Sequence, residues 1–73
     1  MTNPLVGSKL LRIDEVSAAV TYLGYGRPGS ASGDPVWRII RLTKTGSETV
    51  IEYVDGNTEF ISIWSNRAAL SYS

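Results

Sequence analysis

The sequence predicts a small, mainly β protein, and three observations support that prediction. Two segments rich in β-branched and aromatic residues, 36–42 and 49–54, flank a short polar stretch that contains Gly46. Residues 17–25 alternate in a pattern that also suits a strand. Glycine, proline and serine gather between the apolar segments, which is typical of turns and loops. We therefore expect a small antiparallel sheet, either a meander or a hairpin, with a possible short helical segment near residues 60–68.

The segments 36–42 and 49–54 are expected to form the hairpin around which the chain is organised. A three-residue loop, Lys44–Gly46, would close it with a left-handed glycine and a bulge. The resulting register places Arg38 opposite Glu52, Trp37 opposite Tyr53, Ile39 opposite Ile51 and Ile40 opposite Val50. Each face of the hairpin would then carry apolar groups, so each face needs cover. Part of this cover is expected from another subunit or a neighbouring protein.

The segments before the hairpin contain one strand and several weaker signals. Residues 1–8 are expected to be a loose lead-in, and residues 9–16 an extended arm. Residues 17–25 are the better strand. The loop over 26–35 is long for a compact domain, and such loops are often functional or mobile. It is either a flexible crossover between strands or a contact loop that a partner orders.

The segment after the hairpin is ambiguous between helix and strand. Asp55, Gly56 and Asn57 form a strong turn signal. Residues 60–68 alternate as a strand would, but Asn57 could also cap a short helix there, and we favour the helix. An α+β fold is therefore the alternative to the mainly β fold. Residues 70–73 would form a final strand or an extended tail.

Size and composition predict one domain over residues 1–73 that needs outside support. A chain of 73 residues buries only about 60% of the surface it exposes when unfolded. The chain has no cysteine and no histidine, so disulfides and the commonest metal ligands are excluded, and oligomerisation or docking is the remaining usual support. Zero net charge weighs against nucleic acid and anionic membranes, and no apolar run approaches the about 18 residues of a membrane span.

Motif searches predict neither an enzyme nor a cofactor or metal site. Residues 24–29 match the G-x-G-x-x-G pattern of dinucleotide sites, but residues 30–35 cannot form the helix that must follow. Asp55, Asn57 and Glu59 have the spacing of a calcium loop but lack its glycine and its distal glutamate. The serines have no histidine to activate them.

Aromatic residues and arginines are the strongest candidates for binding, because they dominate protein–protein hot spots. Core packing is the simpler interpretation of the tryptophans. A small β-barrel-like module that binds nucleic acid or another protein is an alternative, with Trp37, Arg38 and Arg41 at its surface. The predicted interface residues are Trp37, Ile39, Ile51, Tyr53, Phe60, Trp64, Arg67, Leu70 and Tyr72.

Residues 20–73 also resemble a family of small virion structural proteins of tailed bacteriophages. The resemblance rests on Val-Thr-Tyr-Leu-Gly from residue 20, Val-Trp-Arg-Ile-Ile-Arg-Leu from residue 36, the Asp-Gly at 55–56, and Trp-Ser-Asn-Arg-Ala-Ala-Leu-Ser-Tyr from residue 64. The chain departs from the family at Ile40, where lysine is common, and at Ser65 and Asn66, where two acidic residues are common.

The resemblance implies a protein made in the cytoplasm of a host bacterium and assembled into the virion. Its role there would be structural or adaptor-like, in head decoration, the neck, or tail and fibre attachment. Its partners would be copies of itself, other virion proteins, or both. Neither a membrane nor a cofactor is implied.

Overall fold

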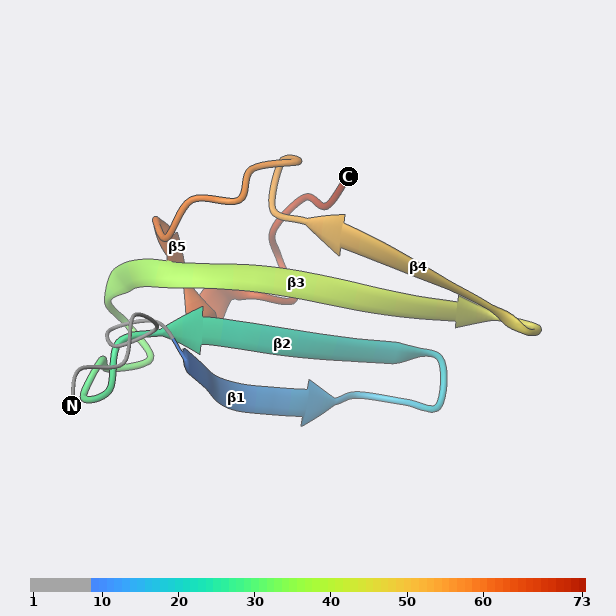
Figure 1. The fold of residues 1–73 in the computed structure, drawn as a ribbon, viewed down its shortest axis with the longest axis horizontal. Coiled ribbons are helices and arrows are strands. Elements are labelled where there is room, and N and C mark those ends of the chain that lie inside the picture. Colours follow the sequence, from blue (N-terminus) through green and yellow to red (C-terminus); the bar gives the residue numbers. More distant parts are fainter. Residues whose placement is uncertain (1–8) are drawn as a thin grey trace, which may run out of the picture.

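The chain forms one antiparallel sheet with a short C-terminal layer packed on one face (Figure 1). The computed structural model describes the backbone of residues 9–73 and the side chains of residues 12–73; the predicted lead-in over 1–8 lies outside this range. The elements are β1 (Lys9–Glu15), β2 (Val20–Gly26), β3 (Pro35–Thr45), β4 (Glu48–Tyr53), β5 (Ser62–Ile63) and the single 3-10 turn η1 (Trp64–Asn66). The strand order is β1-β2-β3-β4, with β5 paired to β3. The prediction of a mainly β antiparallel fold is confirmed.

The first hairpin joins β1 to β2 through residues 16–19. The expected extended arm is β1, and the expected strand over 17–25 begins only at Val20. Ser17 explains the difference, because its Oγ accepts hydrogen bonds from the backbone N–H groups of Ala19 (3.2 Å) and Val20 (3.1 Å). A serine that bonds nearby backbone in this way favours a turn over a strand. The turn therefore uses the first three residues of the predicted strand.

The hairpin between β3 and β4 exists as predicted, but its predicted register is wrong. The turn has two residues, Gly46 and Ser47, with φ of +62° at Gly46. A positive φ at the first of two loop residues suits the twist of the flanking strands. Thr45 then pairs with Glu48, and the residue opposite Glu52 is Arg41 instead of Arg38.

This register also changes the aliphatic and aromatic partners across the hairpin. Tyr53 lies opposite Ile40, and Ile51 lies opposite Leu42. The predicted partners of Tyr53 and Ile51 were Trp37 and Ile39, and both of these lie beyond the end of β4. There β3 pairs with β5 instead, with Trp37 opposite Ser62. β4 and β5 thus share one edge of the long strand β3.

One face of the sheet, here called the covered face, carries the core. Its buried residues are Tyr22, Trp37, Ile39, Val54 and Trp64, with Val20, Leu70 and Tyr72 packed against them. The two tryptophan rings lie 5.9 Å apart between centroids, at 40°. Trp37 is fully buried, and its indole Nε1 donates a hydrogen bond to the carbonyl of Ala31 at 2.9 Å. A buried tryptophan that satisfies its N–H in this way fixes the loop as well as the core.

Two glycines of β2 make room for the tryptophans. A Cβ at Gly24 would lie 2.6 Å from Cε3 of Trp64 and 3.2 Å from Cε3 of Trp37. A Cβ at Gly26 would lie 3.1 Å from Cε3 of Trp37. The glycines that resemble a dinucleotide motif therefore serve packing, since they let two large rings rest on the backbone of the sheet.

The loop over 27–34 is held by the chain itself. It contains two turns, closed by hydrogen bonds from Ser30 N–H to the Arg27 carbonyl and from Asp34 N–H to the Ala31 carbonyl, each 3.1 Å. The carbonyl of Ser32 accepts a hydrogen bond from Ser65 N–H at 3.1 Å. The hydrogen bond between Ser65 and Ser32 ties the loop to the C-terminal layer.

The predicted helix over 60–68 is wrong. Ser62 and Ile63 form a strand on β3, and helical geometry is limited to the single 3-10 turn η1, followed by a turn over 67–69. Strand pairing satisfies backbone groups of β3 that β4 does not reach, and the turn then directs Trp64 into the core. Tertiary pairing outweighs the local helical pattern here. No helix in the described range is long and apolar enough to cross a membrane.

The C-terminal segment closes over the covered face and is fastened at several points. Tyr53 and Ser73 exchange two backbone hydrogen bonds of 3.1 and 2.9 Å, so the last residues extend the sheet beside the end of β4. The phenol of Tyr72 donates to the carbonyl of Arg67 at 2.7 Å. Arg67 in turn forms an ion pair with Asp14 of β1, with 2.8 Å between Nε and Oδ2. This pair links the last layer to the first strand.

We predict that Gly24→Ala destabilises the protein, because the new methyl group must displace Trp64 or the sheet. Overpacking of this kind costs about 1–3 kcal/mol in the free energy of unfolding. Urea denaturation followed by tryptophan fluorescence measures the change. Gly33→Ala is the control, since a Cβ there meets no atom within 4 Å. Equal denaturation midpoints for the two variants would contradict the packing role of Gly24.

We predict that stability falls between about pH 10 and pH 12 and that Tyr72 causes part of the fall. Burial, with a smaller effect of the neighbouring Tyr22, raises the pKa of Tyr72 from 10.0 to about 12. The unfolded chain therefore loses this proton at lower pH than the folded chain, so the contribution is complete below pH 10 and disappears as pH approaches 12.

Tyr72→Phe tests this dependence. It should cost about 0.5–1.5 kcal/mol at pH 8 through the lost hydrogen bond to Arg67. Urea denaturation of both proteins at intervals from pH 8 to about pH 12 should show their difference shrinking above pH 10. A difference that stays constant across this range would rule out the titration of Tyr72 as a cause.

Candidate functional site

Three of the residues predicted to form an interface lie inside the chain. Trp37, Ile39 and Trp64 are 0%, 1% and 5% exposed. Their side chains are therefore unavailable to a partner, and the simpler core interpretation of the tryptophans is the correct one. Their positions on the covered face follow from the strand register, which local sequence patterns did not determine.

The C-terminal members of the predicted set have structural contacts of their own. Leu70 and Tyr72 are half-buried and pack against the core. The guanidinium of Arg67 lies 4.6 Å from the ring centroid of Trp64 and is paired with Asp14. These residues hold the last layer in place. The members of the predicted interface that belong to neither the core nor this layer are Ile51, Tyr53 and Phe60.

The opposite face of the sheet, here called the open face, has no layer over it among the described residues. In Figure 1 the C-terminal segment passes behind β3, so the viewer looks at the open face. Strand pairing aligns one row of this face across all four strands, and a second row of the face lies beside it. The first row contains Ile13, Leu23, Ile40 and Tyr53, and the second contains Glu15, Thr21, Leu42 and Ile51.

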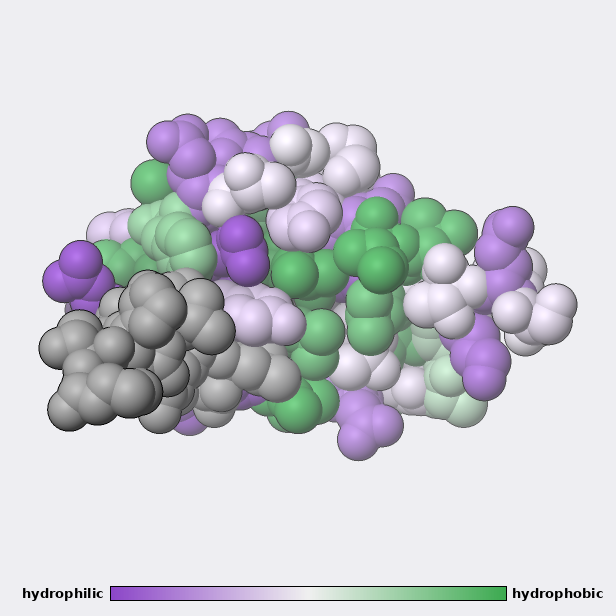
Figure 2. Space-filling model, in the orientation of Figure 1, coloured by the Kyte–Doolittle hydropathy of each residue, from purple (hydrophilic) through white to green (hydrophobic). Residues whose placement is uncertain are grey.

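The open face exposes a substantial apolar surface. Ile13 and Ile51 are each 60% exposed, and Leu23, Leu42 and Tyr53 are partly exposed. Figure 2 shows hydrophobic residues across the middle of this face, with hydrophilic residues around them. Contiguous apolar patches with a polar rim are uncommon on monomers and mark interaction sites. The open face is therefore the candidate functional site.

A cation lies at one end of the open face, held between aromatic rings. The guanidinium carbon of Arg38 is 5.2 Å from the ring centroid of Tyr25 and 5.0 Å from that of Phe60. Its Nε is buried without a hydrogen-bond partner. Among the side chains described, ion pairs join Arg41 to Glu52 and Arg67 to Asp14, and Arg38 belongs to neither. An arginine between aromatic rings at the margin of an apolar patch has the character of an interface hot spot.

Sequence reasoning missed Ile13, Leu23 and Leu42 as members of this site. The signal was present in the alternation of their strands, but the set becomes visible only when the register places the three strands side by side. Ile51 and Tyr53 were predicted, although with the wrong partners on β3.

The residues suggested for nucleic-acid binding do not form one surface. Trp37 is buried, and Arg41 on the covered face is committed to Glu52 at 2.7 Å. That hydrogen bond raises the pKa of Arg41. The guanidinium of Arg41 also lies 4.7 Å from the ring centroid of Tyr72. Arg38 faces the opposite side of the sheet, so the three residues cannot contact one strand of nucleic acid together.

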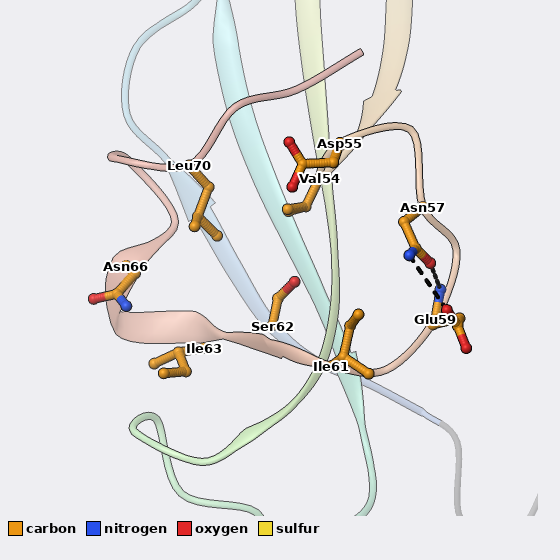
Figure 3. A pocket seen from close by; sticks show the side chains of 9 residues that line it. All are labelled: Val54, Asp55, Asn57, Glu59, Ile61, Ser62, Ile63, Asn66 and Leu70. Atoms are coloured by element: carbon orange, nitrogen blue, oxygen red, sulfur yellow. Dashed lines mark hydrogen bonds between the residues drawn. The ribbon is translucent and has the colours of Figure 1, made fainter.

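A pocket of about 260 Å³ lies on the side of the C-terminal layer (Figure 3). Its floor is apolar, and its rim carries two carboxylates and two amides. The lining residues are Val54, Asp55, Asn57, Glu59, Ile61, Ser62, Ile63, Asn66 and Leu70. With no histidine in the chain, the hydroxyl of Ser62 has no imidazole base to activate it.

The polar rim of the pocket is largely explained by the turn that builds it. Asn57 N–H bonds to the Val54 carbonyl at 2.8 Å, and Asp55 and Gly56 between them have φ of +50° and +67°. Two left-handed residues in this arrangement form a type I′ turn, for which Asp-Gly is a preferred pair. Glu59 N–H donates to Oδ1 of Asn57 at 2.7 Å. No group of three or more potential metal ligands of the His, Cys, Asp and Glu types occurs in the described range.

Comparisons of the chain with protein-family models, with curated proteins and with solved structures found no match.

Proposed function

We propose that the protein is a structural or adaptor component of a tailed-phage virion and that it acts by protein–protein assembly. The proposal combines the resemblance of residues 20–73 to small phage virion proteins with the architecture of the sheet. The protein is made in the host cytoplasm and is assembled into the particle at the head, the neck, or the tail and fibre junction. Copies of itself or other virion proteins are its partners.

The observation that carries the proposal is the exposed apolar surface of the open face. Full burial of an isoleucine side chain contributes about 1.5–3 kcal/mol, and Ile13 and Ile51 leave most of that contribution unused. A chain of 73 residues gains only about 3–5 kcal/mol from its own core. Covering the open face would therefore add a large fraction of the stability of the isolated domain.

We predict that the protein is a stoichiometric component of purified particles of the virus that encodes it. A part held by an apolar face should survive purification and high salt, because burial of apolar surface is not screened by ions. Quantitative mass spectrometry of particles, before and after a wash at about 1 M NaCl, measures its copy number. Absence of the protein from intact particles would contradict the proposed function.

We predict that Ile13→Ser combined with Ile51→Ser lowers incorporation into particles by about tenfold or more, because each change removes apolar surface from the contact. Both side chains are mostly exposed, so the fold should tolerate the changes. Ile61→Ser is the matched control, since Ile61 is 58% exposed but lines the pocket of the C-terminal layer. Similar incorporation of the double variant and the control would contradict a role for the open face.

A further inference from the structure

We infer that two copies of this chain pack open face to open face about a two-fold axis, with Arg38 of each copy paired to Glu15 of the other. This inference rests on the proposed function, because it names a partner for the open face. It starts from two opposite charges at opposite corners of that face. Within residues 12–73, neither takes part in an ion pair.

The strand register fixes the relative positions of the two charges. Arg38 on β3 lies opposite Tyr25 of β2, and Glu15 on β1 lies opposite Thr21 of β2. With strands about 4.8 Å apart and about 3.4 Å per residue, the two Cα positions are about 17 Å apart on the same face. Their midpoint falls on Leu23, which is two residues from both Tyr25 and Thr21 on the strand between them.

Consider a two-fold axis that lies in the plane between the two sheets. It brings Arg38 of one copy over Glu15 of the other only if it passes over that midpoint and runs perpendicular to the line that joins the two residues. The axis perpendicular to the Arg38–Glu15 line runs from Leu23 to Ile51 on the same lattice. Leu23 of one copy would therefore contact Leu23 of the other, and Ile51 would contact Ile51 in the same way. Leu42, which is partly exposed, and Ile40, which is only 7% exposed, lie between them on β3. The centre of the contact is therefore apolar, and both charge pairs lie toward its margin.

The packing geometry is one that sheets adopt. This axis crosses the strands of the two copies at roughly 70°, which is nearer the orthogonal class of sheet packing than the aligned class. The strand register places one further basic residue, Lys44, on this face. The two-fold rotation carries Lys44 of one copy past the outer edge of β4 of the other copy, where it meets no like charge of the sheet. Zero net charge removes the long-range repulsion that would oppose the approach of two copies.

The area of the face sets the strength of the dimer. A footprint of about 20 by 20 Å gives about 400 Å² per copy, which is half of a standard stable interface. We therefore expect a weak dimer of the isolated protein, with a dissociation constant of order 10–100 µM. High local concentration in an assembling particle would populate it.

Charge reversal with mixing tests the inference in the full chain. Sedimentation equilibrium from about 10 µM to 1 mM should show dimerisation of the wild type. Arg38→Glu alone and Glu15→Arg alone should each weaken it by about tenfold or more, since each creates two like-charge contacts. An equimolar mixture of the two variants should recover association, because every contact in the mixed dimer is again between opposite charges.

The mixture also guards against an effect on folding. Glu15 is exposed, so Glu15→Arg should retain the wild-type circular dichroism and urea midpoint. Arg38→Glu removes the contacts of Arg38 with Tyr25 and Phe60, and this loss could affect folding. Recovery of dimerisation in the mixture would show that the Arg38→Glu protein is folded, because an unfolded chain could not pair with the Glu15→Arg protein. Lys44→Glu is the control on the same face and should leave the dissociation constant within about threefold of wild type.

The outcomes separate this inference from the proposed function. Recovery in the mixture supports the reciprocal pair. A monomer at 1 mM, or a dimer that neither single variant weakens, overturns it while leaving assembly with other virion proteins intact. A dimer with the expected charge dependence, from a protein absent from particles, would support the inference and refute the proposed function.

Discussion

The contact of two tryptophans with the glycine backbone of β2 is the interaction on which the rest of this structure depends. Trp37 and Trp64 come from segments far apart in the sequence, and both rings rest where Gly24 and Gly26 have no side chain. This contact joins the C-terminal layer to the sheet. It also orders the loop over 27–34, because Trp37 and Ser65 bind carbonyls of that loop. The other core residues of the covered face pack around these two rings.

Concentrating the core on one face has a direct consequence for the other face. The C-terminal segment is long enough to cover the tryptophans, and its last residues are bound to the end of β4. Within the described residues, nothing similar covers Ile13, Leu23 and Ile51. The sheet is thus a two-layer structure on one side and an apolar surface with a polar rim on the other. This asymmetry, with Arg38 and Glu15 at opposite corners of the open face, is the basis of the dimer that we propose.

The limits of sequence reasoning are clearest in the β3–β4 hairpin. Both strands and the pivot at Gly46 could be predicted, because β-branched residues and a glycine in a polar stretch are local signals. The register could not be predicted. The turn lies at residues 46–47 instead of 44–46, and this change in position and length moves the partner of Glu52 by three positions, from Arg38 to Arg41. Both registers oppose an arginine to that glutamate, so charge pairing alone does not distinguish them. The prediction of a helix over residues 60–68 was wrong for a related reason. Helical spacing is a local pattern, whereas the pairing of Ser62 with Trp37 joins residues far apart in the chain.

The sequence by itself determined a small β-rich domain with no histidine or cysteine chemistry, the hairpin formed by β3 and β4, and turns at Gly46 and at Asp55–Gly56. Each of these features depends on backbone preferences that act within a few residues. Only the tertiary structure decided which aromatic residues are core, which apolar residues share a face, and where Arg38 lies relative to Glu15. Those relations depend on strand register and on which edge of β3 each later segment occupies, and both result from contacts between residues distant in the chain.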